Sequence, residues 1–123
     1  PKREHYHLFH ILLRFPVNAA GPFAATHKVI QKAGLNLSDI DLLEVNDSFL
    51  PFDDVDEIAI YEHDRLNVNG GAIALGHPFV ASGARIMTSM LHELERRGGR
   101  YALQSICCAG GMGTATLIER IDN

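Results

Sequence analysis

The chain has 123 residues, of which 46% are hydrophobic and 21% are charged, and its formal net charge is −4. This length suits one compact domain rather than two. The acidic balance argues against a nucleic-acid partner, whose binding surface would be basic and clustered. No apolar run approaches the roughly 20 residues that span a bilayer, so we expect no membrane partner.

The only two cysteines, Cys107 and Cys108, are adjacent. Neighbouring Cα atoms lie about 3.8 Å apart, whereas ordinary disulfides prefer about 4.4–6.8 Å. We therefore expect two free thiols and a cytoplasmic or other reducing compartment. The segment 1–10 is no convincing signal peptide because histidines interrupt its apolar part. It also lacks an initiator methionine, which favours a processed product or a fragment.

The first half of the chain alternates strand and helix patterns. Residues 6–15 are apolar and β-prone apart from their histidines, which favours a strand. Pro22 suits a first helical turn, apolar residues follow it at helical spacing, and Gly34 ends the predicted helix. Residues 40–45 form a short apolar run, typical of a buried strand. The capping residues that follow, 46–49, indicate a helix start.

The second half is better defined, although residues 58–61 fit a helix end and a short strand equally well. We expect a loop around His77 after the glycine turn at 70–71. An apolar stripe over 82–97 then predicts a helix, ended by Gly98. Strands at 101–107 and 113–118, joined by a glycine-rich turn, predict an antiparallel hairpin. The order β-α-β-α-(β)-α-β-β implies a layered α/β domain with a mixed sheet.

Three side chains carry potential chemistry. His77 precedes the long helix, whose N-terminus disfavours a protonated imidazole, so it could accept a proton or donate to an oxyanion; alternatively, it caps the helix. Cys107 ends a predicted strand beside free amides that would stabilise a thiolate; alternatively, it is a small buried hydrophobe. Asn46 could hold an ordered water or cap a helix. Strand alternation means that only one of Cys107 and Cys108 faces a site.

A metal site is not expected. His5 and His7 share one face of the predicted strand, but His10 points to the other, and no further ligands complete a set. The glycine pair 70–71 lacks the Gly-Lys-Ser/Thr that a phosphate-binding P-loop requires.

Four blocks of the chain resemble motifs of the thiolase C-terminal half, in the same order. They are Gly21-Pro-Phe-Ala-Ala-Thr-His-Lys28, Glu44-Val-Asn-Asp-Ser-Phe49, Asn67 to Arg85 with its Gly-His-Pro, and Cys107-Cys-Ala-Gly-Gly-Met-Gly113. The resemblance implies a thiolase C-terminal domain over 21–123, with a mixed five-stranded sheet and helices on both faces. Residues 1–20 form a poorly matched segment with a possible strand.

The resemblance also implies catalytic roles on thioesters. Cys107 would be the acid/base at the α-carbon of an acetyl group. His77 would activate a nucleophile and donate to the thioester oxygen, and Asn46 would fix the water that completes this oxyanion hole. The backbone N–H of Ala109 would serve a second hole. Three further residues would contact the substrate: Ser48, Phe49 and Gly76.

The implied enzyme condenses acyl-CoA with acetyl-CoA or cleaves 3-ketoacyl-CoA by thiolysis, without metal or redox cofactor, CoA being the substrate carrier. Its expected partners are the missing N-terminal half, which supplies the nucleophilic cysteine, and further copies in a homo-oligomer. Alone, the chain should be inactive. Val80, where the family usually has glycine, favours the alternative of a non-catalytic domain acting in CoA binding or assembly. A ketoacyl-synthase relative is disfavoured because those enzymes place His or Asn at the position of Cys107.

Overall fold

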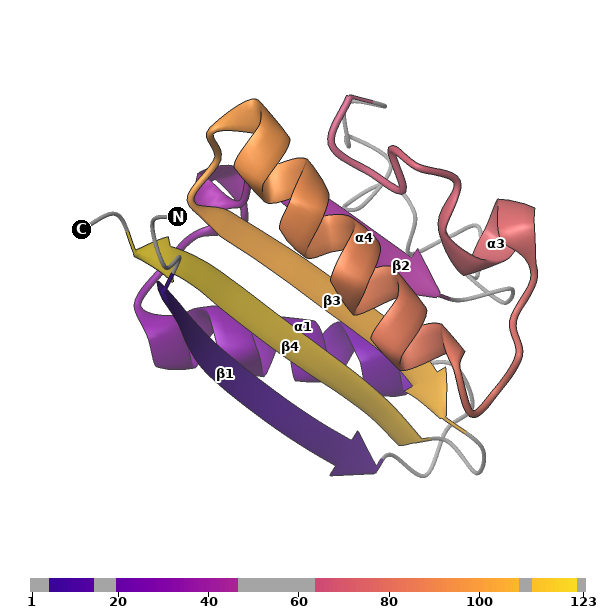
Figure 1. Ribbon diagram of the computed structural model, residues 1–123. Coiled ribbons are helices and arrows are strands. Elements are labelled where there is room, and N and C mark those ends of the chain that lie inside the picture. Colours follow the sequence, from indigo (N-terminus) through magenta and orange to yellow (C-terminus); the bar gives the residue numbers. More distant parts are fainter. Residues whose placement is uncertain (1–4, 15–19, 47–63, 109–111, 122–123) are drawn as a thin grey trace.

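The computed structural model describes residues 5–14, 20–46, 64–108 and 112–121 of the chain. In these residues four strands form one sheet in the order β1-β4-β3-β2, with β1 and β3 antiparallel to β4 and β2 parallel to β3 (Figure 1). The strands are β1 (His5–Arg14), β2 (Leu42–Asn46), β3 (Tyr101–Cys108) and β4 (Met112–Ile121). The predicted layered α/β fold with a mixed sheet and an antiparallel hairpin is confirmed.

One long helix covers each face of the sheet. In Figure 1, α4 (Ser82–Arg97) crosses in front of the strands and α1 (Ala20–Ala33) runs behind them. The helix α4 ends at Gly98, whose φ of 70° is the left-handed conformation that glycine adopts freely. Two shorter elements complete the described fold, the 3-10 helix η1 (Leu37–Asp39) and α3 (Gly71–Leu75).

Strand alternation divides the core into two layers. On the α1 side, Val29 packs with Leu43, Leu103 and Leu117. On the α4 side, Met90 and Leu94 pack with the neighbouring strand residues Leu42, Ala102 and Ile118. Each fully buried aliphatic side chain contributes about 1.5–3 kcal/mol. The two layers hold β2 and β3 firmly, and these are the strands whose carboxyl ends reach the candidate site.

Several predicted bounds shift. The helix α1 starts at Ala20, so Pro22 lies in its first turn, where its missing N–H leaves no intrahelical bond unmade. The predicted loop after the glycine turn contains the short helix α3. The ambiguous segment 58–61 and the predicted helix start after Asn46 lie outside the described residues. Beside the outer edge of β2, Leu66 makes one parallel bridge with Leu43, at the position a fifth strand would take.

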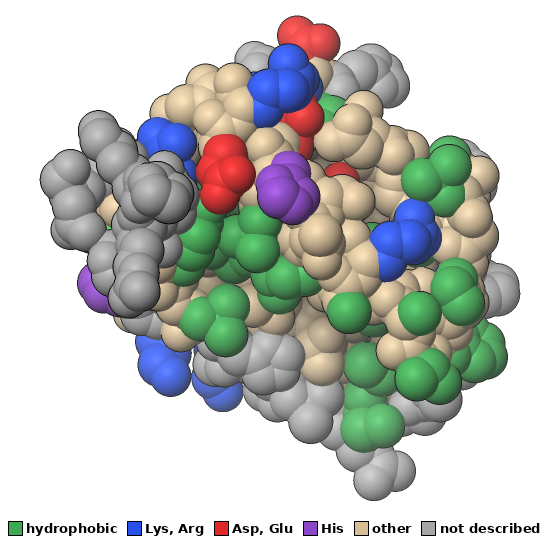
Figure 2. Space-filling view, in the orientation of Figure 1, with side chains coloured by type: hydrophobic (Ala, Val, Ile, Leu, Met, Phe, Trp, Pro, Cys, Tyr) green, Lys and Arg blue, Asp and Glu red, His purple; other side chains and the backbone are tan. Residues whose placement is uncertain are grey.

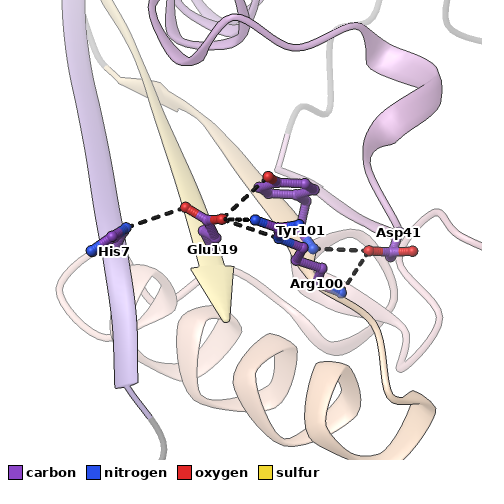
Figure 3. Close-up of polar contacts among 5 residues, drawn as sticks. All are labelled: His7, Asp41, Arg100, Tyr101 and Glu119. Carbon is purple, nitrogen blue, oxygen red and sulfur yellow. Dashed lines mark hydrogen bonds and ion pairs between the residues drawn. The ribbon is translucent and has the colours of Figure 1, made fainter. Parts of the chain in front are cut away.

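The end of the sheet where β3 begins carries a polar network (Figure 3). Asp41 accepts hydrogen bonds from the backbone N–H groups of Arg100 and Tyr101, both at 2.8 Å. Glu119 of β4 accepts from the Arg100 guanidinium at 2.7 Å and from the Tyr101 hydroxyl at 3.2 Å. It also pairs with His7 of β1 at 3.2 Å. We call these five residues the distal network.

None of the described helices is long and apolar enough to cross a membrane.

Candidate active site at the carboxyl ends of β2 and β3

The site begins at the last residue of β2. In this strand Leu42, Glu44 and Asn46 alternate with Leu43 and Val45, and Leu42 packs against α4. Glu44 and Asn46 therefore face the α4 side as well. Both are buried, with 4% and 7% of their surface exposed. Two polar side chains are thus held in the layer between the sheet and α4, at the end of the strand.

A tight turn after residue 64 is tied to β2 through Asn67. The Asn67 side-chain amide accepts from the Val45 N–H at 2.9 Å and donates to the Val45 carbonyl at 3.1 Å, as a neighbouring strand residue would. The turn continues through Gly70 and Gly71, with φ values of 88° and 56°. A Cβ on Gly71 would come within 3.0 Å of Glu44 Oε2, so this position requires glycine. The glycine turn therefore leads directly into α3, and His77 follows two residues after this helix ends.

His77 meets Asn46 above the end of β2. The Asn46 amide Nδ2 lies 3.1 Å from His77 Nδ1 and 3.2 Å from Nε2. His77 Nδ1 also lies 2.7 Å from the Ser82 hydroxyl, and that hydroxyl donates to the Pro78 carbonyl at 3.1 Å. Two residues that the sequence singles out are therefore in direct contact. Ser82 is fully buried and extends the group to the first turn of α4.

The hydrogen bond from Ser82 to the Pro78 carbonyl favours one tautomer of His77. A hydroxyl has one proton to donate, and the Ser82 proton points to the Pro78 carbonyl. Ser82 Oγ then accepts from Nδ1–H, and the lone pair on Nε2 accepts the Asn46 amide proton. In this tautomer Nε2 is the unprotonated nitrogen, and its lone pair is engaged by the Asn46 amide. His77 can take up a proton at Nε2 when that amide moves away.

The relation of His77 to the long helix differs from the sequence-based expectation. The helix α4 begins at Ser82, five positions after His77, so His77 does not cap it and reaches the helix through the Ser82 hydroxyl. Gly76, a predicted substrate-binding residue, has a φ of 91° and its carbonyl accepts from Arg85 Nη2 at 2.8 Å. The loop that carries His77 is therefore fastened at Gly76 and at Ser82.

The two cysteines occupy the last positions of β3. Ser105 faces α1, where it bonds Thr26 and the Pro22 carbonyl, whereas Gln104 and Ile106 lie against Gly83 of α4. Regular alternation continues Ser105 to Cys107 and Ile106 to Cys108. Alternation by itself thus places Cys108, not Cys107, on the His77 side. The role predicted for Cys107 therefore depends on how the chain continues through 109–111, outside the described residues.

Three predicted site residues lie outside the described residues altogether. They are Ser48 and Phe49, which follow β2, and Ala109, which follows β3. Both cysteines are free thiols of intermediate exposure, as the sequence leads one to expect.

Sequence reasoning assigned no role to three neighbours of the site. Ser82 lies in the quoted Asn67 to Arg85 block. Glu44 lies two residues before Asn46, and period-two alternation already places both on one face. Burial raises the pKa of Glu44 to about 7, and the nearby positive charge of Arg85 works against this rise. Ser82 and Arg85 hold the His77 loop by hydrogen bonds to His77 and to Gly76.

An exposed apolar surface adjoins His77. The Phe79 ring packs edge-on against the imidazole, with 4.9 Å between ring centroids, yet 87% of Phe79 is exposed. Val80 is fully exposed, and Ile73 and Leu75 of α3 are more than half exposed. Figure 2 shows hydrophobic side chains gathered on the side of the molecule that carries α3. We call these four residues the α3 patch.

Comparison with known families decides the identity of the fold. The family model described as "Thiolase, C-terminal domain" matches residues 16–120. The chain belongs to the thiolase family. The matched range contains all four sequence blocks and every residue of the candidate site.

Individual relatives of this thiolase domain support the same family assignment. It is 49% identical over 100 residues to 3-ketoacyl-CoA thiolase, mitochondrial, of Homo sapiens, a match that spans 80% of this chain and 25% of the relative. It is 48% identical over 103 residues to acetyl-CoA acetyltransferase of Escherichia coli, covering 83% and 26%. The chain spans about a quarter of the length of these curated relatives.

A solved structure matches the fold closely. The crystal structure of human mitochondrial 3-ketoacyl-CoA thiolase in complex with CoA superposes with a TM-score of 0.77 at 43% identity. The superposition covers 95% of this chain and 29% of the human chain. The relatives are named as acyltransferases and thiolases, and that human protein is named as binding CoA.

Proposed function

We propose that this domain supplies the acid–base half of a thiolase active site, which condenses acyl-CoA with acetyl-CoA or cleaves 3-ketoacyl-CoA by thiolysis. The observation that carries the proposal is the hydrogen-bonded Asn46–His77–Ser82 group, in a chain 49% identical over 100 residues to a named 3-ketoacyl-CoA thiolase.

In this proposal His77 acts first as a base and then as a donor. Nε2 takes the proton of a nucleophilic thiol, which lies in the complementary part of the enzyme, and the thiolate attacks the acyl-CoA carbonyl. The thioester C–S bond then breaks, and CoA leaves with the proton of the Cys107 thiol, which becomes a thiolate. The new Nε2–H then donates to an oxyanion, where a fixed donor stabilises developing charge. Asn46 helps to hold the imidazole and the water of this hole.

Cys107 is proposed to remove the second proton of the reaction, the α-proton of acetyl-CoA. As a thiolate it removes the α-proton of acetyl-CoA, and the resulting carbanion attacks the acyl group on the nucleophilic cysteine. That cysteine leaves as a thiolate and regains a proton, while the backbone N–H of Ala109 stabilises the enolate oxygen. Ser48, Phe49 and Gly76 are proposed to contact the pantetheine arm. The reactive thiols suit a reducing compartment.

The partners proposed for the domain are CoA thioesters, the remainder of the thiolase chain and further copies of the enzyme. The α3 patch supports an apolar partner, because exposed hydrophobic side chains clustered beside a site are typical of an interface. No cofactor beyond the CoA substrate is required by this chemistry, since each step is a proton or acyl transfer.

A chimera tests the proposal. This chain would replace the corresponding C-terminal domain of the Escherichia coli acetyl-CoA acetyltransferase, and thiolysis of acetoacetyl-CoA would be measured. We expect turnover that Cys107→Ala abolishes and that Cys108→Ala, the matched control, retains. A soluble, assembled chimera without turnover would contradict the proposal.

The alternative is a thiolase-like domain that binds CoA without turnover. Strand alternation favours it, because it places Cys107 away from His77, and so does the fully exposed Val80 beside that histidine. The same chimera separates the two functions. Binding of CoA with no thiolysis would support the alternative, and Val80→Gly would then not restore activity.

A further inference from the structure

Glu44 is the buried titratable group that the proposed chemistry leaves unused. It lies on β2 two residues before Asn46, on the same face, and is 4% exposed. Its Oε2 sits against the backbone of Gly71 and beside the Asn67 side chain. A carboxyl buried this deeply without a specific purpose would be costly.

The neighbour of Glu44 across the sheet offers it a partner. Gln104 is its register partner on β3 and faces the same α4 side. Gln104 is also buried, and its Oε1 has no hydrogen-bond partner among the described residues. A protonated carboxyl is the kind of donor that such an amide oxygen lacks, because an ionised one can only accept.

Arg85 connects Glu44 to the His77 loop. The charge of Arg85 on α4 acts on Glu44, while Asn67, Gly71 and Gln104 around it are uncharged. The same guanidinium donates through Nη2 to the carbonyl of Gly76 at 2.8 Å. Gly76 directly precedes His77, so a change in the position of Arg85 is passed to the residue before the imidazole.

We propose that Glu44 is a positioning residue that sets the placement of the His77 loop through Arg85. When Glu44 is protonated it donates to Gln104 Oε1, and Arg85 holds the Gly76 carbonyl. When Glu44 loses this proton to water, its carboxylate draws the guanidinium inward and weakens the bond to Gly76. The catalytic meaning of this rests on the proposed function, but the contacts themselves do not.

Glu44 changes its protonation state near neutral pH because of its burial. Burial raises the pKa of Glu44 to about 7 despite the opposing charge of Arg85. Both forms of the carboxyl are therefore populated under ordinary conditions. A buried glutamate with a lower pKa would stay ionised and could not act in this way.

NMR on the full chain tests the proposal without any assay of activity. The carbonyl carbon of Gly76 and the carboxyl carbon of Glu44 would be followed from about pH 5 to pH 9. We expect the Gly76 signal to show a step with the same midpoint as Glu44. Independent midpoints, or a flat Gly76 signal, would overturn the proposal, and this wild-type comparison needs no variant.

Variants sharpen the result. Glu44→Gln and Arg85→Met should each remove the Gly76 step, whereas the control Glu93→Gln, a buried glutamate bound by other arginines, should leave it. Persistence of the step in Glu44→Gln would overturn the proposal. In the chimera, Glu44→Gln should remove one inflection from the pH profile of kcat. A chimera without turnover alongside a shared NMR midpoint would refute the proposed function and leave this inference standing.

Discussion

The pKa values of the carboxyl groups at the two ends of the sheet are shifted in opposite directions. At the distal network, Glu119 is bound by Arg100, Tyr101 and His7, and its pKa is lowered chiefly by the hydrogen bond from Arg100. At the site, Glu44 has its pKa raised to about 7 by burial. On the neighbouring strand β3, Gln104 is the register partner of Glu44, and its Oε1 has no hydrogen-bond partner among the described residues.

The difference lies in hydrogen bonding rather than in the presence of an arginine. Glu93 of α4 is as buried as Glu44, but Arg96 and Arg97 bond it directly and lower its pKa to about 2. Arg85 acts on Glu44 only through its charge. Direct pairing fixes a charge for stability, whereas burial without it leaves a proton free to exchange, as an acid–base site requires.

The largest expected effect separates the two ends by activity. His77→Ala in the chimera should lower kcat about 10³-fold, because it removes both the base and the oxyanion donor. His7→Ala, in the distal network, should change kcat by less than about twofold, since it removes an exposed hydrogen bond to Glu119 far from the site. Steady-state kinetics of both variants measure this, and equal losses would erase the functional distinction between the ends.

The second prediction concerns stability against pH, followed by urea unfolding. Because the folded pKa of Glu44 is raised to about 7, its contribution to stability is fully present below pH 4.5 and is lost as pH rises from 4.5 to about 7. Glu44→Gln should therefore gain about 2–3 kcal/mol relative to wild type between about pH 5 and pH 8.

Glu93→Gln should behave in the opposite sense. Its folded pKa is lowered to about 2, so its contribution is present above pH 4.5 and is lost as pH falls towards 2. Discounting for the exposed arginines, we expect a loss of about 1–2 kcal/mol at neutral pH that disappears in acid. If both glutamate variants changed the free energy of unfolding in the same direction at neutral pH, the contrast between Glu44 and Glu93 would be contradicted.

The third prediction isolates Ser82. Ser82→Ala removes the acceptor that holds His77 Nδ1–H, so the imidazole should lose its fixed tautomer in ¹⁵N NMR spectra. A single hydrogen bond of this kind corresponds to about a 10- to 100-fold loss of kcat, with little change in KM. Thr88→Ala, which deletes another α4 hydroxyl that bonds only the Ala84 carbonyl, is the control and should retain activity.

The smallest effect belongs to the distal network. Asp41→Ala leaves two backbone N–H groups, of Arg100 and Tyr101, to be satisfied by water. Because Asp41 is exposed, we expect a loss of about 1 kcal/mol of unfolding free energy and unchanged kcat. A drop in kcat at constant stability would show that this end reaches the site.

The sequence predicted the long elements well because their patterns repeat. The helix α4 has an apolar stripe over four turns and a glycine stop, and it is found at the expected bounds of 82 and 97. The short helix α3 was missed because five residues are too few to establish a helical period. It is fixed by Gly70 and Gly71 in left-handed conformations, which only the packing against β2 reveals.

The candidate site was predictable only where its residues belong to recognisable sequence motifs. Asn46 and His77 stand in motif blocks, and the resemblance assigns both to one oxyanion hole, whereas their direct contact is found only in the structure. The roles of Ser82 and Arg85 depend on where α4 begins and on a bond to a loop carbonyl, which have no sequence pattern. For Cys107, the resemblance and strand alternation point to different faces, so its role stays a prediction.

Alkylation of the two adjacent cysteines tests the central claim most directly. The full chain would be treated with iodoacetamide near neutral pH, and the rates at Cys107 and Cys108 would be resolved by mass spectrometry in wild type and in His77→Ala. A thiol beside an imidazole reacts faster, so the account predicts that Cys107 leads by about tenfold and that His77→Ala slows only Cys107. If His77→Ala slows Cys108 instead, or neither thiol, then the imidazole and the Cys107 sulfur do not share a site.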